Sequence, residues 1–497
     1  MPKVNVAHRA PGRRLFAVTV TIGALLLGAC GPPPSSGGGS GGRAATGTTK
    51  KLPPCPLDAL EKATGKVKVN LWFGGIVSPP VDVLKDLIKA FNQSQDKIVV
   101  TADDQGTAYA EVLRKYEGAS SKPKQLPQMI LVEDTALGEM VDKGQILPAQ
   151  SCMEADGYDP TQIIPSARAH YEVDGVLYPA FFNVSTPVLY YNKVHFKKAG
   201  LDPDKPPGTL AEMAAAARKI KAAKVAPKPI SFLTNQWFFN TWLAGVGQDA
   251  VNNRNGRSKP PTKATFDTAE AQGALTSLDN MNKEGLLNPF PVTDGSIDHY
   301  LALITEQSSM LIETSTASGT IAQALAGDLT GEDIGVSVDP SLLDAKKVLP
   351  GSGPMPGLAA PGKVYASGGG FYILNTSSPA QQAASWKFFK FMLQEANAKK
   401  WTVPGGYLPM VKAVNDDPEV AKYFAERVDG VLLKPAADQL AAADPDQAGP
   451  LIGAYTKYGD AIEGALEGVL FNGADPKAAL TKASDEVDAL LRSYNGD

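Results

Sequence analysis

The chain has 497 residues, of which 43% are apolar and 20% are charged, and its formal net charge at pH 7 is −4. This composition is that of a soluble globular protein, and so small a net charge favours neither a nucleic-acid partner nor an acidic lipid surface. The length suits two domains of ordinary size rather than one simple core.

The N-terminus has the features of an export signal. Arginines precede a short apolar stretch that ends in Leu27-Gly28-Ala29-Cys30, and this stretch is too short for a membrane-spanning helix. The pattern resembles a bacterial lipoprotein signal, so residues 1–29 are expected to be removed and Cys30 to carry lipid. An ordinary secretory signal with a stray cysteine is the alternative. Residues 30–52 are rich in Gly, Ser, Pro and Thr, which predicts a flexible tether.

Strands and helices alternate in the segment that follows the tether. Residues 67–73 alternate apolar and polar side chains and predict a strand, and apolar residues at helical spacing follow Pro80. Further elements follow in the same order: a strand at 97–102, a helix at 109–116, a buried strand at 129–132 and a helix from Leu137. This succession is typical of an α/β domain.

The second half of the chain is more helical. It begins with two strand-like pieces, the second of which ends at 188–192. The remaining elements are expected as a helix at 210–223, an aromatic-rich segment at 237–245, a helix at 272–283, strands at 310–312 and 371–374, and a helix at 380–394. The rest of the chain is predicted to be mostly helical, and no internal repeat is visible.

Two cysteines remain if Cys30 carries lipid. In an oxidising compartment, Cys55 and Cys152 are expected to form a disulfide, which would close a loop worth about 4–5 kcal/mol in the chain-entropy model. Two unpaired buried thiols are the alternative.

The histidines give no sign of a metal site or a catalytic centre. His8 lies in the leader, and His170, His195 and His299 are scattered without ligand spacing. The sequence contains no HExxH, CxxC, GxSxG or phosphate-loop motif. We therefore predict no catalytic residue, no metal and no cofactor, and we expect each remaining histidine to be structural or at the surface.

One block of sequence resembles a known family. The block is Asn183-Val184-Ser185-Thr186-Pro187-Val188-Leu189-Tyr190-Tyr191-Asn192-Lys193, followed by related residues at 196–203 and 206–209. It closely resembles family 1 extracellular solute-binding proteins of ABC importers, and in particular the branch that binds sn-glycerol 3-phosphate and glycerophosphodiesters. Weaker matches extend the resemblance over roughly residues 66–491.

The resemblance implies an α/β, two-lobed periplasmic-binding-protein-like fold of type II, with the ligand in a cleft between discontinuous lobes. The N-terminal lobe is expected at 53–180 plus 371–410, and the C-terminal lobe at 181–370 plus 411–497. The chain would cross between the lobes near 178–187, 365–370 and 406–412. Such proteins close around their ligand by a hinge motion.

The resemblance also implies ligand-binding residues. A carboxylate accepts hydrogen bonds from two hydroxyls of a polyol, Trp and Tyr offer apolar faces with a polar tip, and glycine lets a backbone N–H approach a ligand closely. The matching positions are Trp72, Tyr109, Asp134, Ser185, Trp237, Ser318, Gly368 and Tyr407.

These positions also have structural interpretations. The aromatic residues are candidates for the core, Asp134 stands where it could cap a helix, and Ser185 could be a turn residue before Pro187. Arg427 is the nearest match to the phosphate-binding arginine of the branch, but gaps are needed to place it. Without that arginine, a phosphodiester or a neutral sugar is as well supported as a phosphomonoester.

The sequence therefore predicts a lipid-anchored, monomeric substrate-binding protein on the outer face of the cell membrane. It would deliver a glycerophosphodiester, glycerol 3-phosphate or a sugar to ABC permease subunits, without chemistry of its own. One alternative is a secreted carbohydrate hydrolase that pairs Asp134 with Asp298 or Glu313. Another is a surface lipoprotein without a transport role.

Overall fold

The computed structural model describes residues 52–76, 79–293, 296–326 and 349–496. The predicted signal peptide, Cys30 and nearly all of the predicted tether lie outside these residues. Within the described ranges, no helix combines the length and the apolar character needed to cross a membrane.

The first of two large sheets has strand order β2-β1-β3-β13-β4, with β7 paired to β13. β1 runs parallel to β2 and β3, whereas β13 is antiparallel to β3, β4 and β7. The strands are β1 (Val67–Phe73), β2 (Ile98–Asp104), β3 (Met129–Val132), β4 (Ile146–Leu147), β7 (Phe181–Phe182) and β13 (Gly370–Leu374).

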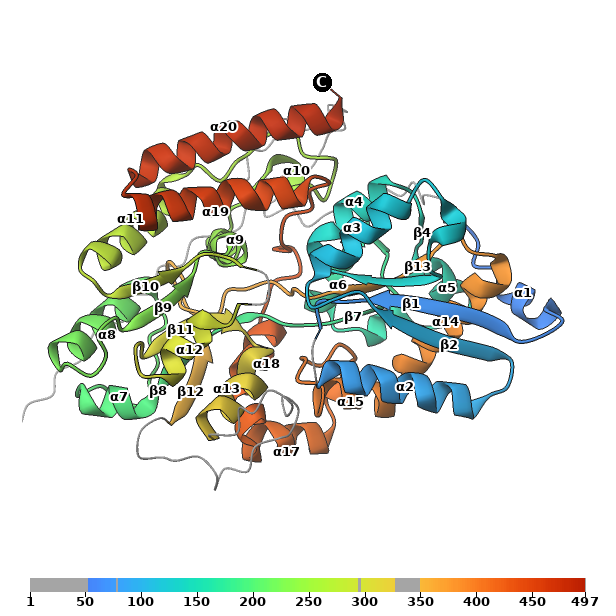
Figure 1. Cartoon of the computed structure of the whole chain (residues 1–497), viewed down its shortest axis with the longest axis horizontal. Coiled ribbons are helices and arrows are strands. Elements are labelled where there is room, and N and C mark those ends of the chain that lie inside the picture. The colour runs from blue at the N-terminus through green and yellow to red at the C-terminus, as the bar shows by residue number, and fades with distance from the viewer. Residues whose placement is uncertain (1–51, 77–78, 294–295, 327–348, 497) are drawn as a thin grey trace, which may run out of the picture. The chain divides into compact units, whose positions relative to one another are not determined.

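Helices cover both faces of the first sheet, whose central strands β3 and β13 are buried on both faces (Figure 1). α2 (Pro80–Ser94) and α14 (Pro379–Met392) share a core with Leu71 and Phe73. α3 (Tyr109–Ala119) and α4 (Leu137–Asp142) share another core with Trp72. This division follows from the two-residue period of a strand, which sends neighbouring side chains to opposite faces.

The second large sheet has strand order β10-β9-β11-β8-β12. β9 is parallel to β10 and β11, and β8 is antiparallel to β11 and β12. The strands are β8 (Pro187–Asn192), β9 (Ile230–Leu233), β10 (Leu287–Phe290), β11 (Met310–Thr314) and β12 (Pro350–Pro354). Their core includes residues of α8 (Leu210–Ala222), α9 (Gln236–Gly245), α11 (Ala269–Lys283), α19 (Tyr455–Asn472) and α20 (Pro476–Asn495).

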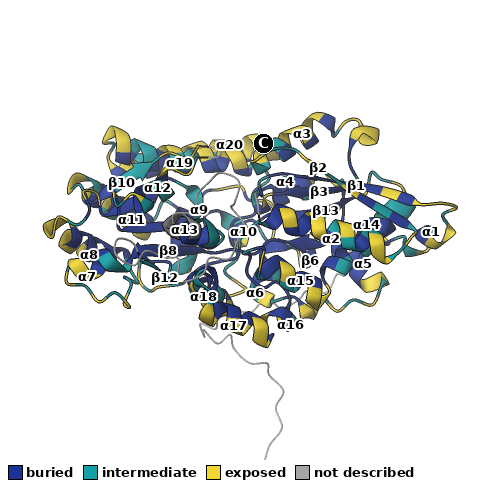
Figure 2. Cartoon of the chain, turned by 60° about the horizontal axis from the view of Figure 1, so that its bottom comes forward, coloured by how far each residue is buried: buried dark blue, intermediate teal, exposed yellow. Residues whose placement is uncertain are grey.

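Shorter elements complete the described structure. The remaining α-helices are α1 (Leu57–Lys62), α5 (Ala149–Ala155), α6 (Pro165–Tyr171), α7 (Lys193–Lys198), α10 (Asn252–Asn255), α12 (Asp298–Ile304), α13 (Ala317–Ala326), α15 (Glu395–Thr402), α16 (Lys412–Asn415), α17 (Pro418–Glu426) and α18 (Val428–Ala441). Three 3-10 turns are η1 (Pro123–Gln125), η2 (Asp134–Ala136) and η3 (Pro160–Gln162), and β5 (Glu172–Val173) pairs with β6 (Val176–Leu177). Buried residues follow the strands, and exposed residues follow the outer faces of the helices (Figure 2).

Cys55 and Cys152 form the predicted disulfide. The bond joins the segment before α1 to α5, and it encloses β1, β2 and β3 in the loop between the two cysteines.

Three connecting segments run between the two sheets. The chain leaves the first sheet after β7 to enter β8, and it returns between β12 and β13. These two connections pair where Ser185 and Ser367 form an antiparallel bridge. The third connection follows α15, and the Leu408 N–H donates to the Val184 carbonyl at 2.9 Å.

The predicted elements are present with small differences at their ends. The strand predicted at 97–102 is β2, which begins one residue later, and the helix predicted at 109–116 is α3, which continues to Ala119. The α/β periplasmic-binding-protein-like fold is confirmed, whereas the predicted lobe boundaries stay a prediction.

Candidate functional site

A pocket of about 270 Å³ lies beside the bridge between Ser185 and Ser367. A second pocket of about 350 Å³ shares Tyr109, Asn235 and several other lining residues with it, so the two are parts of one cleft. Six residues predicted from the sequence line the first pocket: Tyr109, Asp134, Ser185, Trp237, Gly368 and Tyr407.

The structure places the three other predicted residues away from these pockets. Trp72 is directed to the α3 face of the first sheet, where the Lys115 Nζ lies 4.4 Å from its ring centre. Ser318 is 1% exposed in the first turn of α13. Arg427 lies at the junction of α17 and α18, with its Nε 3.7 Å from Asp429 Oδ1.

The Asp134 carboxylate is already engaged within the protein. Its Oδ1 accepts hydrogen bonds from the Ser367 hydroxyl at 3.1 Å and from the Gly368 N–H at 3.2 Å. Its Oδ2 lies 2.5 Å from the His170 Nε2. Asp134 opens η2 without capping it through its side chain, so its main contacts brace the connection that contains Ser367.

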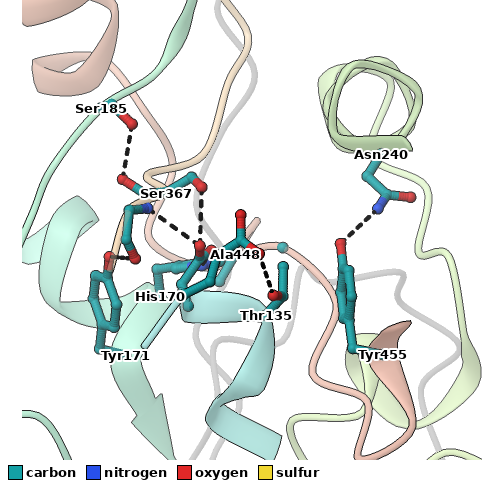
Figure 3. Close-up of polar contacts among 12 residues, drawn as sticks. Thr135, His170, Tyr171, Ser185, Asn240, Ser367, Ala448 and Tyr455 are labelled. Atoms are coloured by element: carbon teal, nitrogen blue, oxygen red, sulfur yellow. Dashed lines mark hydrogen bonds and ion pairs between the residues drawn. The ribbon is translucent and has the colours of Figure 1, made fainter. Parts of the chain in front are cut away.

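Gly368 has to be glycine for that arrangement. Its φ is +138°, and a Cβ there would lie 2.7 Å from the Asn183 carbonyl oxygen. Ser185 adds a hydrogen bond from its hydroxyl to the Ser367 carbonyl at 3.1 Å. Figure 3 shows Ser185, Ser367, His170 and Tyr171 gathered in this part of the cleft.

His170 was expected to be structural, and the structure places it both in a hydrogen-bond network and in the pocket lining. The side chain is buried, stacks on Tyr365 with ring centres 5.4 Å apart, and meets Tyr171 edge-on. Burial lowers the pKa of His170, and Asp134 opposes this effect. The imidazole is therefore held neutral at physiological pH.

Two tyrosines of the lining are fixed by their neighbours. The Asn183 amide donates to the Tyr109 hydroxyl at 3.1 Å and accepts from the Trp401 indole at 3.1 Å. Tyr407 stacks on Trp401, with ring centres 5.7 Å apart and planes 7° apart. Burial raises the pKa of Tyr407 to about 12, so its hydroxyl remains protonated and can donate a hydrogen bond.

The start of α9 contributes the opposite side of the first pocket. The Asn235 side chain caps the helix by accepting from the Trp237 N–H at 2.7 Å. The Trp237 ring lines the pocket, and its buried indole N–H has no hydrogen-bond partner among the described residues. Behind this helix start, Tyr455 is bonded to Asn240 and Gln236, as Figure 3 shows for Asn240.

Acidic side chains line both pockets. Glu133, Asp134 and Glu313 line the first pocket, and Asp460 and Glu463 line the second. Burial and the neighbouring carboxylates raise the pKa of Glu463 to about 7. None of the described residues that line either pocket is a lysine or an arginine.

Several lining residues carried no sequence signal strong enough to identify them. Tyr455 and Glu463 come from a segment distant in sequence that only the tertiary fold brings to the pockets, whereas Tyr365 and Ser367 lie in the crossing predicted at 365–370. Asn235 and Gln236 were noticeable as polar neighbours of Trp237, which is the pattern that could have indicated them.

Comparisons with known proteins identify the family and the fold. Residues 86–426 match the family of bacterial extracellular solute-binding proteins. The chain is 28% identical over 364 residues to the sn-glycerol-3-phosphate-binding periplasmic protein UgpB of Brucella melitensis, a match that covers 71% of this chain and 77% of the relative. It is 26% identical to the protein of the same name from Rhizobium meliloti, over 84% of this chain and 93% of the relative.

Solved structures show the same fold. UgpB from Mycobacterium tuberculosis, solved in complex with glycerophosphocholine, matches with a TM-score of 0.69 and 20% identity over 87% of this chain and 100% of its own. The cyclic alpha-maltosyl-1,6-maltose binding protein from Arthrobacter globiformis matches with a TM-score of 0.67 and 20% identity, over 86% of this chain and 100% of its own.

Proposed function

Because the chain belongs to the bacterial extracellular solute-binding proteins, we propose that it is the substrate-binding protein of an ABC importer. It captures a polar small molecule in the cleft described above and delivers it to membrane permease subunits. A sugar is the preferred ligand, a glycerophosphodiester with a cationic head group is second, and glycerol 3-phosphate is disfavoured.

The residues that line the cleft are the basis for this preference. Trp237, Tyr109 and Tyr407 offer aromatic faces to the C–H surfaces of a sugar, and acidic and hydroxyl side chains stand beside them. A phosphomonoester would bring its negative charges next to Glu133 and Glu313 with no lysine or arginine among the described lining residues. Such a charge is costly to bury without a cationic partner. Arg427 does not supply that partner, since its Nε lies beside Asp429.

Binding without hydrolysis is favoured by the state of the two most buried carboxylates in the lining. A glycosidase needs one carboxyl group to protonate the leaving group and another to attack or to activate water. The oxygens of Asp134 face Ser367, Gly368 and His170. Glu313 bonds to His299 at 2.8 Å through Oε2 and to the Thr314 N–H at 2.8 Å through Oε1. Asp298 lies outside both pockets.

Closure of the cleft completes the proposal. The predicted lobes, 53–180 plus 371–410 and 181–370 plus 411–497, hinge about the three connections that meet beside the first pocket. A ligand shifts such an equilibrium only by its differential affinity for the closed state, which requires contacts on both sides of the cleft. Residues after β3 and residues at the start of α9 supply those two sides.

The same proposal places the protein outside the cell as a monomer, held on the membrane by lipid on Cys30 and connected by the tether 30–52. The Cys55–Cys152 disulfide supports an oxidising location. Labelling with a radioactive fatty acid, in cells that express the wild type or Cys30→Ala, tests the anchor. Label on the variant would contradict it.

Ligand-induced stabilisation tests the function. We would measure the melting temperature with maltose, trehalose, cellobiose, glycerophosphocholine and glycerol 3-phosphate. A compound at about a hundred times its Kd adds about 2.7 kcal/mol. We expect a sugar or glycerophosphocholine to raise the melting temperature and to be recovered intact. Stabilisation by glycerol 3-phosphate alone would overturn the ligand preference, and recovery of a cleaved compound would overturn the binding function.

A further inference from the structure

A run of left-handed backbone stands next to the segment that leads into α19. Asn253, Arg254 and Asn255 have φ values of 61°, 56° and 58°, and Gly256 follows at 78°. These residues include most of α10, whose backbone is therefore left-handed rather than that of an ordinary α-helix, and we call Asn253–Gly256 the left-handed turn. Residues other than glycine adopt this conformation at a cost of roughly 1–2 kcal/mol each, so surrounding contacts have to hold it.

Those contacts fasten the left-handed turn to residues 448–451. The Leu451 N–H donates to the Asn255 carbonyl at 2.9 Å, and the Asn255 amide donates to the Ala448 carbonyl at 3.3 Å. A Cβ on Gly256 would lie 2.0 Å from the Leu451 carbonyl oxygen, so only glycine permits this approach. Pro450, within the fastened segment, lines the first pocket.

Arg257 follows the left-handed turn, and its side chain lies behind the residues that line the first pocket. Its Nε and Nη2 donate to the Gly449 carbonyl at 2.9 and 2.8 Å. Its Nη1 donates to the carbonyls of Glu172 at 3.0 Å and Ala169 at 3.4 Å, at the end of α6. Burial lowers the pKa of Arg257 to about 10, which still leaves the guanidinium charged at neutral pH.

Arg257 also determines which ring nitrogen of His170 carries the proton. Its Nη2 lies 3.5 Å from the His170 Nδ1, and a guanidinium can only donate hydrogen bonds. The Nδ1 must therefore present its lone pair, which places the imidazole proton on Nε2, facing Asp134 Oδ2. A second proton on Nδ1 would meet the N–H of a neighbouring cation.

We propose that Arg257 is a positioning residue of the cleft, which keeps the His170 proton on Nε2, where it donates to Asp134, and thereby fixes Asp134 against the connection containing Ser367 and Gly368. The proposal rests on the proposed function in one respect: it takes the side of the cleft that contains Asp134 and His170 to contact the ligand. The tests below use no ligand, so their failure is separate from a failure of the proposed function.

The groups that face His170 define its response to pH. Asp134 follows β3, Arg257 follows the left-handed turn, Tyr171 lies on α6, and Tyr365 lies in the connection between β12 and β13. Burial and Arg257 both lower the pKa of His170, whereas Asp134 raises it. Removing the charge of Arg257 leaves Asp134 as the dominant charged neighbour, so the pKa of His170 should rise.

The first test is the titration of His170 in the wild-type protein. Long-range 1H–15N spectra of protein labelled with 15N-histidine report the tautomer and the protonation state, and His170→Gln identifies the signal. We expect the Nε2–H tautomer and a neutral ring at pH 7. A ring that is protonated with an ordinary pKa of about 6.5, or that carries its proton on Nδ1, would overturn the proposal without any Arg257 variant.

The second test compares Arg257→Met with Arg254→Met. Arg254 belongs to the same turn, but it is exposed and lies 3.4 Å from Asp446. We expect the pKa of His170 to rise in Arg257→Met and to stay unchanged in Arg254→Met. Hydrogen exchange should show faster exchange of the Gly368 N–H in Arg257→Met, with a pH dependence that follows His170.

Two outcomes of this comparison would refute the proposal. One is an unchanged His170 titration in a folded Arg257→Met protein, and the other is an equal shift in both variants. Arg257→Lys extends the test, because it retains the charge while losing the fork of donors. It should keep His170 neutral yet still accelerate exchange at Gly368.

Discussion

The two sides of the cleft differ in how completely their polar groups are satisfied. The first wall, which contains Asp134, His170 and Gly368, is held by hydrogen bonds among its own members. The second wall comprises the start of α9 and the facing part of α19, and it presents a buried Trp237 indole N–H that has no partner in the part of the chain that the structure describes. Its Glu463 carboxyl has a pKa raised to about 7. The described structure thus satisfies the polar groups of the first wall, whereas we propose that a ligand supplies the partner of the Trp237 indole N–H.

The largest expected effect comes from breaking the first wall with Asp134→Ala. The change leaves His170, the Ser367 hydroxyl and the Gly368 N–H without their common acceptor. We expect the free energy of unfolding to fall by about 4 kcal/mol, as measured by urea denaturation, because each buried donor left without an acceptor costs about 1–3 kcal/mol. Glu133→Ala, which removes the exposed carboxylate next to it, should change the unfolding free energy by less than about 1 kcal/mol. Equal losses in the two variants would contradict this account of the wall.

Glu463→Gln should increase the free energy of unfolding at high pH. The folded-state pKa of about 7 lies above the ordinary 4.5, so between these values the folded state keeps a proton that the unfolded state releases. Stability therefore falls as pH rises through this window, by about 3 kcal/mol at pH 8. Glutamine resembles the protonated acid, so the variant should be more stable than the wild type at pH 8 and similar to it at pH 4.5.

The matched control for this change is Glu486→Gln on α20, where an exposed carboxylate lies 3.5 Å from Lys482. It should leave the pH dependence of urea denaturation as in the wild type. An equal gain at pH 8 from both variants would show that net charge, rather than the position of Glu463, is responsible.

A smaller effect is expected from Trp237→Phe, measured by calorimetric titration with whichever compound stabilises the protein. Phenylalanine keeps an aromatic face but removes the unpartnered N–H, so affinity should fall about fivefold, or about 1 kcal/mol. Trp242 is the matched control, because its buried indole donates to the Pro356 carbonyl at 2.9 Å. Trp242→Phe should reduce stability and leave affinity unchanged, and the opposite pattern would contradict the assignment.

The sequence predicts the fold well because local periodicity and burial agree. The alternation in β1 and the apolar run of β3 each indicate a strand, and the structure contains both. Periodicity does not say which face of a strand meets the cleft. Trp72 illustrates this limit, because it lies on the α3 face of the first sheet.

The site was predictable at the positions that match the family resemblance, and six of those residues line the first pocket. Ser185 and Gly368 could be placed from the family resemblance, whereas His170, Tyr455 and Glu463 lie on helices whose surface pattern does not reveal their tertiary neighbours. Arg427 could be placed only with gaps, and the structure puts it at a helix junction. Arg257 gave no signal either, because its role depends on the left-handed backbone before it.

The disulfide between Cys55 and Cys152 determines how a pulling force would travel through the protein. Tension that enters at Leu52 passes from Cys55 to Cys152 through the sulfur atoms and bypasses the 97-residue separation between them. β1, β2 and β3 lie within that bypassed loop, together with Tyr109 and Asp134. A protein held by its N-terminus in flowing medium can therefore be loaded mechanically without stretching the strands that support the first wall.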